Sequence, residues 1–341
     1  MEAARVVVVG AGSWGTTIAA LLAERVLTTL WARNPAVVEA VSRRHENPDY
    51  LPGAALPHDL RVTSSLDEAV ADADVVLMAV PSHGFRAVLT GMRGHLRDGA
   101  VVVSLAKGIE MGTNLRMTQV IAEMLPDHPA GVLTGPNLAH EVAAGQPAAT
   151  VVALPDEAQA ELVQSLLHCN TFRVYTATDV VGCEIAGASK NVMAIASGIS
   201  DGLGFGENTR AVLITRGLVE QARLGMALGG RALTFGGLAG VGDLVATCTS
   251  PHSRNRTVGY SLGKGKPLAE VLAGMHMVAE GVRTAGPLVS LAQAQGVEMP
   301  IAEQVAALVA GKKSPEEAVA ELMERPPRPE HDEDLLRELS R

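Results

Sequence analysis

Lys190 is the residue whose neighbours in the sequence most suggest chemistry. Apolar residues recur at positions 181, 185, 188, 192, 195 and 199, which is the spacing of one buried helix face. Lys190 projects nearly opposite that stripe, and its own face otherwise carries small residues such as Cys183, Gly187 and Ala194. A single ammonium among small side chains indicates a second packed surface, where its pKa can be shifted toward a functional value. The alternative is an ordinary solvated lysine.

A second group of chemically capable residues lies between positions 240 and 256. Its glycines allow the backbone to approach a ligand, and Asp243 supplies a carboxylate. Ser253, Arg254 and Asn255 are donors typical of phosphate sites. The alternative is a polar loop with two solvated arginines. A nucleic-acid site is disfavoured, because the net charge is −9 and no aromatic residues are interleaved with the basic ones.

A third motif lies near the N-terminus, where Gly10, Gly12 and Gly15 form a GxGxxG string with Ser13 and Trp14. It follows the apolar run 6–9 and precedes a helical pattern over 16–24, so it predicts a turn that holds a dinucleotide pyrophosphate at a helix start. The next expected strand, 27–31, ends without the acidic residue that usually binds ribose hydroxyls. Arg33 lies there instead and would suit a 2′-phosphate, which predicts that NADPH is accepted. A solvated arginine at a helix start is the alternative.

Elements of two kinds must position these groups, and they divide the chain. Up to residue 178, apolar strands alternate with helices, which is typical of a parallel sheet covered on both faces. We expect strands at 6–9, 27–31, 74–80, 101–106, 131–133, 149–154 and 172–175. Only helical patterns follow, at 180–199, 208–225, 268–274, 287–295, 302–309 and 315–323. The predicted α/β fold is therefore an N-terminal Rossmann-type parallel sheet domain (1–178), an all-α C-terminal domain (179–323) and a polar tail (324–341), which we expect to be mobile or loosely docked.

Length and composition limit the other possibilities. A chain of 341 residues predicts about two domains. Its three cysteines are odd in number and form no CxxC pair, which disfavours a disulfide framework or a zinc site, and we expect no metal. No apolar run approaches 18 residues and the first residues do not resemble a signal peptide, so we expect a cytoplasmic protein without a membrane span.

Together these motifs resemble those of the bacterial NAD(P)-dependent glycerol-3-phosphate dehydrogenase family, over residues 6 to about 323. The resemblance rests on the glycine turn with Trp14, on Lys190-Asn191-Val192, and on Gly242-Asp243 followed by Ser253-Arg254-Asn255. It implies reversible NAD(P)H-dependent reduction of dihydroxyacetone phosphate to sn-glycerol 3-phosphate, which supplies the glycerophospholipid backbone. It also implies a homodimer. The rival interpretations are another reductase of this architecture, of hydroxyacid or ketopantoate type, and a non-catalytic NADPH-binding sensor.

The resemblance also assigns residues. Contacts to NADPH or NADH would come from the glycine turn and from Ser13, Trp14, Arg33, Lys107, Ala139, Arg254, Val278 and Glu280. Contacts to the phosphorylated triose would come from Lys107, Gly135, Asn137, Lys190, Asp243, Ser253, Arg254 and Asn255. Lys190 would accept and donate the proton, with Asp243 as its partner. Asn137-Leu138 departs from the family pattern, which has a hydroxyl residue followed by Phe.

Overall fold

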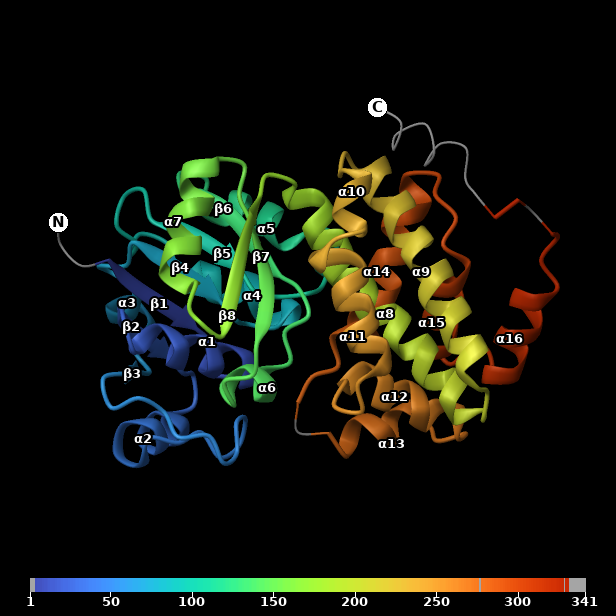
Figure 1. Ribbon diagram of the computed structural model, residues 1–341, viewed down its shortest axis with the longest axis horizontal. Coiled ribbons are helices and arrows are strands. Elements are labelled where there is room, and N and C mark those ends of the chain that lie inside the picture. Colours follow the sequence, from blue (N-terminus) through green and yellow to red (C-terminus); the bar gives the residue numbers. More distant parts are fainter. Residues whose placement is uncertain (1–3, 276, 328, 331–341) are drawn as a thin grey trace. The chain divides into compact units, whose positions relative to one another are not determined.

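The computed structural model describes residues 4–275, 277–327 and 329–330 (Figure 1). These residues form two compact units. The first consists of the described residues up to Ala106 together with residues 117–180, and the second of residues 107–116 together with the described residues from Val181 onward. The predicted domain boundary after residue 178 lies two residues before the end of the first unit at Val180. A larger difference is the segment 107–116, which belongs to the second unit. It packs with the helical half because Ile109 is buried in the same apolar core as Ile185 and Val192.

The first unit contains a sheet of eight strands. They are β1 (Arg5–Val9), β2 (Leu27–Trp31), β3 (Arg61–Thr63), β4 (Val75–Met78), β5 (Val101–Ser104), β6 (Ala130–Thr134), β7 (Ala148–Ala153) and β8 (Phe172–Ala177). Their order is β3-β2-β1-β4-β5-β6-β7-β8, and every neighbouring pair is parallel except β6 and β7, which are antiparallel. The prediction of a parallel sheet is confirmed apart from this pair. An apolar strand has the same pattern in both directions, so periodicity cannot detect the reversal.

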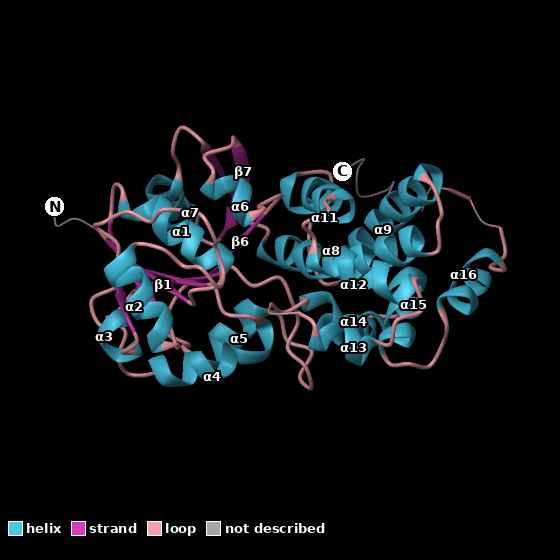
Figure 2. Cartoon of the chain, turned by 90° about the horizontal axis from the view of Figure 1, so that it is seen from below, coloured by secondary structure: helices cyan, strands magenta, loops and turns pink. Residues whose placement is uncertain are grey.

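Helices cover both faces of this sheet. They are α1 (Ser13–Ala23), α2 (Pro35–Arg44), α3 (Leu66–Val70), α4 (Ser82–Met92), α5 (Met117–Met124), α6 (Ala139–Ala143) and α7 (Glu157–Leu167). In Figure 2, α1 and α7 lie on one side of the strands and α4 and α5 on the other. Residues Val6–Val9 of β1 are at most 3% exposed for this reason, since both of their faces are covered. The glycine turn therefore begins from a rigid central strand.

The second unit is built around one long buried helix, α8 (Val180–Gly202), which carries Lys190. The remaining elements are α9 (Glu207–Ala227), α10 (Ala232–Phe235), the π-helical turn η1 (Leu238–Gly242), α11 (Asp243–Thr249), α12 (Arg254–Gly263), α13 (Leu268–Ala273), α14 (Glu280–Ala294), α15 (Pro300–Val309) and α16 (Pro315–Met323). The all-α prediction for this half is confirmed. The expected helix at 287–295 starts earlier, at Glu280, because α14 accommodates Pro287 in its interior.

Helices α8 and α12 cross in direct backbone contact. Gly198 and Gly202 on α8 face Gly259 and Gly263 on α12. On each helix the two glycines are four residues apart, which is about one helical turn. A Cβ atom at Gly198 would lie 2.0 Å from the Arg256 carbonyl oxygen, so no larger residue fits there. The crossing places the first residues of α12, where the expected phosphate donors lie, against the helix that carries Lys190.

The stretch Ala232–Thr249 meets the length and apolarity of a membrane-crossing helix. It consists of α10, η1 and α11, and it contains the buried carboxylate of Asp243. Its breaks and its charged residue fit a core segment of the helical unit better than a membrane span.

Two side-chain contacts involve the described part of the tail. Arg325 forms an ion pair with Glu298 (2.8 Å), and Arg216 donates to the Glu330 carbonyl (3.2 Å). Residues 328 and 331–341 lie outside the described residues, so the expected mobility of the tail stays a prediction.

Candidate active site

One carboxylate in the second unit holds two ammonium groups. Asp243 accepts from Lys190 Nζ on Oδ1 (2.8 Å) and from Lys107 Nζ on Oδ2 (2.6 Å). Lys190 Nζ also donates to Thr247 Oγ1 (2.6 Å). Lys190 is 7% exposed and Asp243 1%, so the cluster is almost closed to solvent. The structure thus brings together three residues that the sequence predicted, and it adds Thr247.

The local fold explains this placement. Asp243 is the first residue of α11, where the helix dipole favours a carboxylate. Thr247 lies four residues later on the same face and donates to Asp243 Oδ1 (3.2 Å). Thr247 lies within the motif 240–256. Its contact with Lys190 was not predicted, because nothing in the sequence distinguishes this threonine from one that packs in an apolar stretch.

The cluster carries more positive than negative charge. Burial opposes the charge on Asp243, but the ammonium groups of Lys107 and Lys190 outweigh it and hold the pKa of the carboxyl below its usual value. Burial lowers the pKa of Lys107 from 10.5 to about 8, and repulsion from Lys190 adds to this, against the attraction of Asp243. Two cations against one anion leave a buried excess of positive charge, which suits an oxygen that becomes negative during a reaction.

A chain of buried amides connects the segments around this cluster. Asn191 Nδ2 donates to the Lys107 carbonyl (2.8 Å), and Asn255 Nδ2 donates to Asn191 Oδ1 (2.8 Å). Asn255 Oδ1 in turn accepts from the Gly281 backbone N–H (2.9 Å). The chain joins the Lys107 segment, α8, the start of α12 and the start of α14. Asn255, predicted as a substrate contact, therefore also has a structural use.

The expected phosphate donors lie at the start of α12. The Ser253 hydroxyl is the N-cap and accepts from the Arg256 N–H (3.3 Å). Arg254 follows as the first helical residue, and its side chain is exposed. Glu280, the first residue of α14, lies close enough to Arg254 for their charges to attract. A helix N-terminus without acidic residues and with an arginine at its first position can bind a phosphate.

The glycine turn of the first unit has an open side. Gly10 has φ +113°, and a Cβ atom there would lie 2.8 Å from the Ala79 carbonyl oxygen. A Cβ atom at Gly15 would lie 1.9 Å from the Gly10 carbonyl oxygen, so both glycines are required by the protein itself. At Gly12, the N-cap of α1, a Cβ atom would meet nothing within 4 Å. The absence of a side chain at Gly12 therefore leaves free space beside the start of α1. A cofactor pyrophosphate can approach the backbone there.

Residues behind the turn hold it in place. Asn47 is fully buried and donates to the Ala11 carbonyl (3.0 Å) and to Thr16 Oγ1 (2.8 Å). Ser13 Oγ donates to the Tyr50 carbonyl (2.5 Å). The Trp14 indole N–H is buried and finds no acceptor among the described residues, which fits a group completed by a ligand. Asn47 was not predicted, because it lies in a proline-interrupted loop without periodicity.

The other predicted residues of the first unit follow strand ends. Arg33 lies two residues after the end of β2 and is exposed. Gly135 has φ +147° after β6, where a Cβ atom would lie 3.1 Å from the Thr150 Cα. Asn137 Nδ2 donates to Thr150 Oγ1 (2.8 Å), and its buried Oδ1 has no partner among the described residues. Ala139 begins α6, and its carbonyl accepts from Thr17 Oγ1 (3.2 Å). Val278 belongs to the second unit and is half-buried just before α14.

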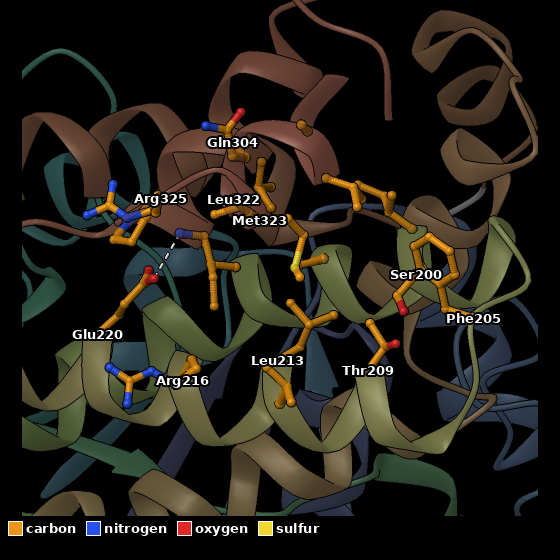
Figure 3. Close-up of a pocket in the computed structure, with 18 of the residues that line it drawn as sticks. Ser200, Phe205, Thr209, Leu213, Arg216, Glu220, Gln304, Leu322, Met323 and Arg325 are labelled. Carbon is orange, nitrogen blue, oxygen red and sulfur yellow. Dashed lines mark hydrogen bonds between the residues drawn. The ribbon is translucent and has the colours of Figure 1, made fainter. Parts of the chain in front are cut away.

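A cavity of about 500 Å³ lies elsewhere in the second unit, among α8, α9, α15 and α16 (Figure 3). Its walls are mostly apolar, and none of the predicted site residues lines it. Glu220 accepts there from the backbone N–H groups of Ile301 (2.8 Å) and Ala302 (3.2 Å), and so caps α15. Burial raises the pKa of Glu220 to about 7, although the two N–H groups oppose this.

Comparison with known proteins finds one family that is similar to this chain over nearly its whole length. The family models for the N-terminus and the C-terminus of NAD-dependent glycerol-3-phosphate dehydrogenase match residues 5–160 and 179–320. A glycerol-3-phosphate dehydrogenase [NAD(P)+] of Sphingopyxis alaskensis is 54% identical over 91% of this chain and 93% of its own. One from Thermobifida fusca is 51% identical over 96% and 98%.

Solved structures give the same result. The glycerol-3-phosphate dehydrogenase of Coxiella burnetii is similar with a TM-score of 0.91 and 37% identity, over 95% of this chain and 99% of its own. A ketopantoate reductase family protein from Ralstonia eutropha has a TM-score of 0.59 at 19% identity, which is a likeness of fold alone. The chain therefore belongs to the NAD-dependent glycerol-3-phosphate dehydrogenase family.

Proposed function

We propose that the chain catalyses reversible reduction of dihydroxyacetone phosphate by NAD(P)H to sn-glycerol 3-phosphate, with Lys190 as the proton donor. Family membership supports the reaction and the cofactor. The single observation that carries the assignment of residues is the Lys190–Asp243–Lys107 cluster, buried in the unit that also holds the phosphate donors of α12.

The glycine turn and the start of α1 would hold the cofactor pyrophosphate, with the open side of Gly12 admitting it. NAD(P)H, when bound, supplies the hydride. Arg33 follows the second strand and would meet a 2′-phosphate. The start of α12, with Arg254, would bind the phosphate of the substrate and thereby orient its ketone.

Lys190 would act on the ketone oxygen. An ammonium has three donors, and two of them go to Asp243 and Thr247. The third can reach the substrate oxygen, stabilise its developing charge and transfer a proton to it. In the reverse direction, the neutral amine takes the proton from the hydroxyl. Asp243 would orient the ammonium, and Lys107 would add positive charge on the other side of the carboxylate.

The finer proposals on the setting of the enzyme come from the family resemblance. They are a cytoplasmic location, a product that supplies the glycerophospholipid backbone, and a homodimer. Sedimentation equilibrium of the full chain tests the last of these, and a monomer at micromolar concentration would exclude it.

The test of the function is an absorbance assay at 340 nm with NADPH and dihydroxyacetone phosphate. We expect oxidation of NADPH and formation of sn-glycerol 3-phosphate. Turnover of ketopantoate or of a 2-oxo acid instead would favour another reductase of this architecture. Binding of NADPH without turnover of any of these substrates would favour the non-catalytic sensor.

A further inference from the structure

The segment from Lys107 to Arg116 is a small folded piece in its own right. Ile109 and Arg116 form an antiparallel bridge, and the Glu110 N–H donates to the Leu115 carbonyl (2.9 Å). Gly112 (φ +88°) and Asn114 (φ +58°) adopt left-handed conformations, which turn the chain back on itself. The segment therefore forms one compact body, with Lys107 at one end and Arg116 at the other.

This body is attached at both ends to one face of α8. Asn191 Nδ2 binds the Lys107 carbonyl (2.8 Å), and the Arg116 guanidinium forms an ion pair with Glu184. Glu184 and Asn191 are seven residues apart, so they lie on the same face about two turns, or roughly 10 Å, from each other. Between the two attachments, Ile109 is 1% exposed and packs into the apolar core.

The ion pair is largely removed from water, since the side chains of Arg116 and Glu184 are 15% and 7% exposed. Breaking a buried pair leaves an uncompensated charge, so the pair tolerates little displacement. The main effect of the ion pair is therefore to fix the position of segment 107–116 relative to α8. The same helix carries Lys190, so fixing the segment on α8 also fixes Lys107 relative to Lys190.

We propose that Arg116 and Glu184 are a positioning pair, which fixes the segment 107–116 on α8 and so holds the Lys107 ammonium against Asp243 for the reaction. Neither residue would touch the substrate. The kinetic part of this proposal rests on the proposed function. The attachment itself does not, and it is tested separately.

The first experiment measures attachment without any turnover. Hydrogen–deuterium exchange of the full chain, read by mass spectrometry, reports on the amides of peptide 107–116. We expect about tenfold faster exchange in this peptide in Glu184→Gln and in Arg116→Gln, because exchange follows the population of locally opened states. Glu321→Gln, which breaks the surface pair with Lys313, is the control and should leave the peptide unchanged. Unchanged exchange in both variants, or equal acceleration along all of α8 and α15, would overturn the proposal.

The second experiment is a double-mutant cycle on kcat/KM for dihydroxyacetone phosphate. Glu184→Gln should lower kcat/KM by about 10- to 100-fold in the otherwise native chain, as expected when a reacting group is misplaced. In the Lys107→Ala background it should change kcat/KM by less than about twofold, since effects that act through one residue are not additive. An equal loss in both backgrounds would show that Glu184 acts through general packing, and would overturn the proposal.

Measurements of kcat/KM for two variants of Arg116 keep the test decisive if Glu184→Gln does not fold. Arg116→Lys retains the charge and should keep most of kcat/KM, whereas Arg116→Gln should not. Equal values for these two variants would count against the pair. A native chain that does not turn over dihydroxyacetone phosphate at all would contradict the proposed function, and the exchange experiment would still decide the attachment.

Discussion

Lys190 and Lys107 bind the two oxygens of one carboxylate, Asp243, at 2.8 and 2.6 Å. The shared carboxylate therefore holds two ammonium groups close to each other, and repulsion from Lys190 contributes to the lowered pKa of Lys107. The two lysines differ in position. Lys190 lies in the middle of helix α8, whereas Lys107 lies in a loop from a distant part of the chain that reaches the same carboxylate.

Replacement of Lys190 tests proton transfer. General acid–base contributions are typically 10²–10⁴-fold, so Lys190→Ala should lower kcat by about that factor. The affinity for NADPH, measured by fluorescence titration, should change much less, because Lys190 is not assigned to the adenine half of the cofactor. Lys312→Ala, an exposed lysine of the same unit, is the control. A folded Lys190→Ala enzyme with near-native kcat would rule out this role.

The lowered pKa of Lys107 predicts how kcat/KM changes at alkaline pH. Its pKa is lowered to about 8, so it loses its positive charge at a pH where ordinary lysines keep theirs. If its charge is needed for substrate binding, kcat/KM should fall as the pH rises through about 8. In Lys107→Arg the guanidinium stays charged, and the fall should move upward by about one pH unit or more. An identical profile in both enzymes would assign the fall to another group.

The phosphate site is tested by comparing two substrates. Arg254→Ala should lose a charge-assisted contact worth about 1.5–3 kcal/mol in kcat/KM toward dihydroxyacetone phosphate. Toward dihydroxyacetone, which has no phosphate, the loss should be much smaller. Similar losses for both would indicate that Arg254 serves the cofactor or the fold.

Cofactor choice is tested at Arg33, which is exposed after β2. Arg33→Asp places a negative charge where a 2′-phosphate would lie, so the KM for NADPH should rise far more than the KM for NADH. Initial rates with each cofactor give the two constants. Equal changes in both would remove Arg33 from the ribose site.

Glu220 predicts a pH dependence of stability. Its pKa is about 7 in the folded protein against an ordinary 4.5, so the folded state binds the proton more tightly than the unfolded state. The free energy of unfolding should therefore fall as the pH rises from 4.5 to 7, by at most about 3 kcal/mol at 1.36 kcal/mol per pH unit. Glu220→Gln does not titrate and should lack this part of the fall.

Urea denaturation of both proteins at pH 5 and pH 8 measures this difference. Glu270→Gln, an exposed carboxyl on α13, is the control and should behave like the native chain. If Glu220→Gln loses as much stability between pH 5 and pH 8 as the native chain, Glu220 does not titrate in this interval.

The features that could be predicted from the sequence are those encoded over short distances. The glycine turn between β1 and α1, the apolar face of α8 and the proximity of Asp243 to the phosphate donors all lie within stretches of about 20 residues. Periodicity reads such stretches well. Helices α10 and α11 were missed because they are only 4 and 7 residues long, and α12 was missed because its glycines interrupt any apolar pattern.

The features that could not be predicted depend on distant residues. Lys107 and Asp243 are 136 residues apart, and Arg116 and Glu184 are 68 apart. Asn47 supports the glycine turn from a loop 36 residues away. A single sequence gives the residue types at these positions but not which of them meet, because side-chain pairing is decided by packing of the whole unit.

The membership of residues 107–116 in the helical unit has a consequence for synthesis of the chain. Asp243 is made 136 residues after Lys107, which takes roughly 7 to 27 s at about 5–20 residues per second. During that interval core partners of Ile109, such as Ile185 and Leu244, are still to be translated. A C-terminal fragment that begins at residue 179 and is expressed alone would lack Ile109 from its core. It would also lack the ammonium group of Lys107, one of the two that bind Asp243. A circular permutant that begins at Lys107 leaves this interval unchanged, because residues 117–180 still lie between the loop and the rest of the helical unit.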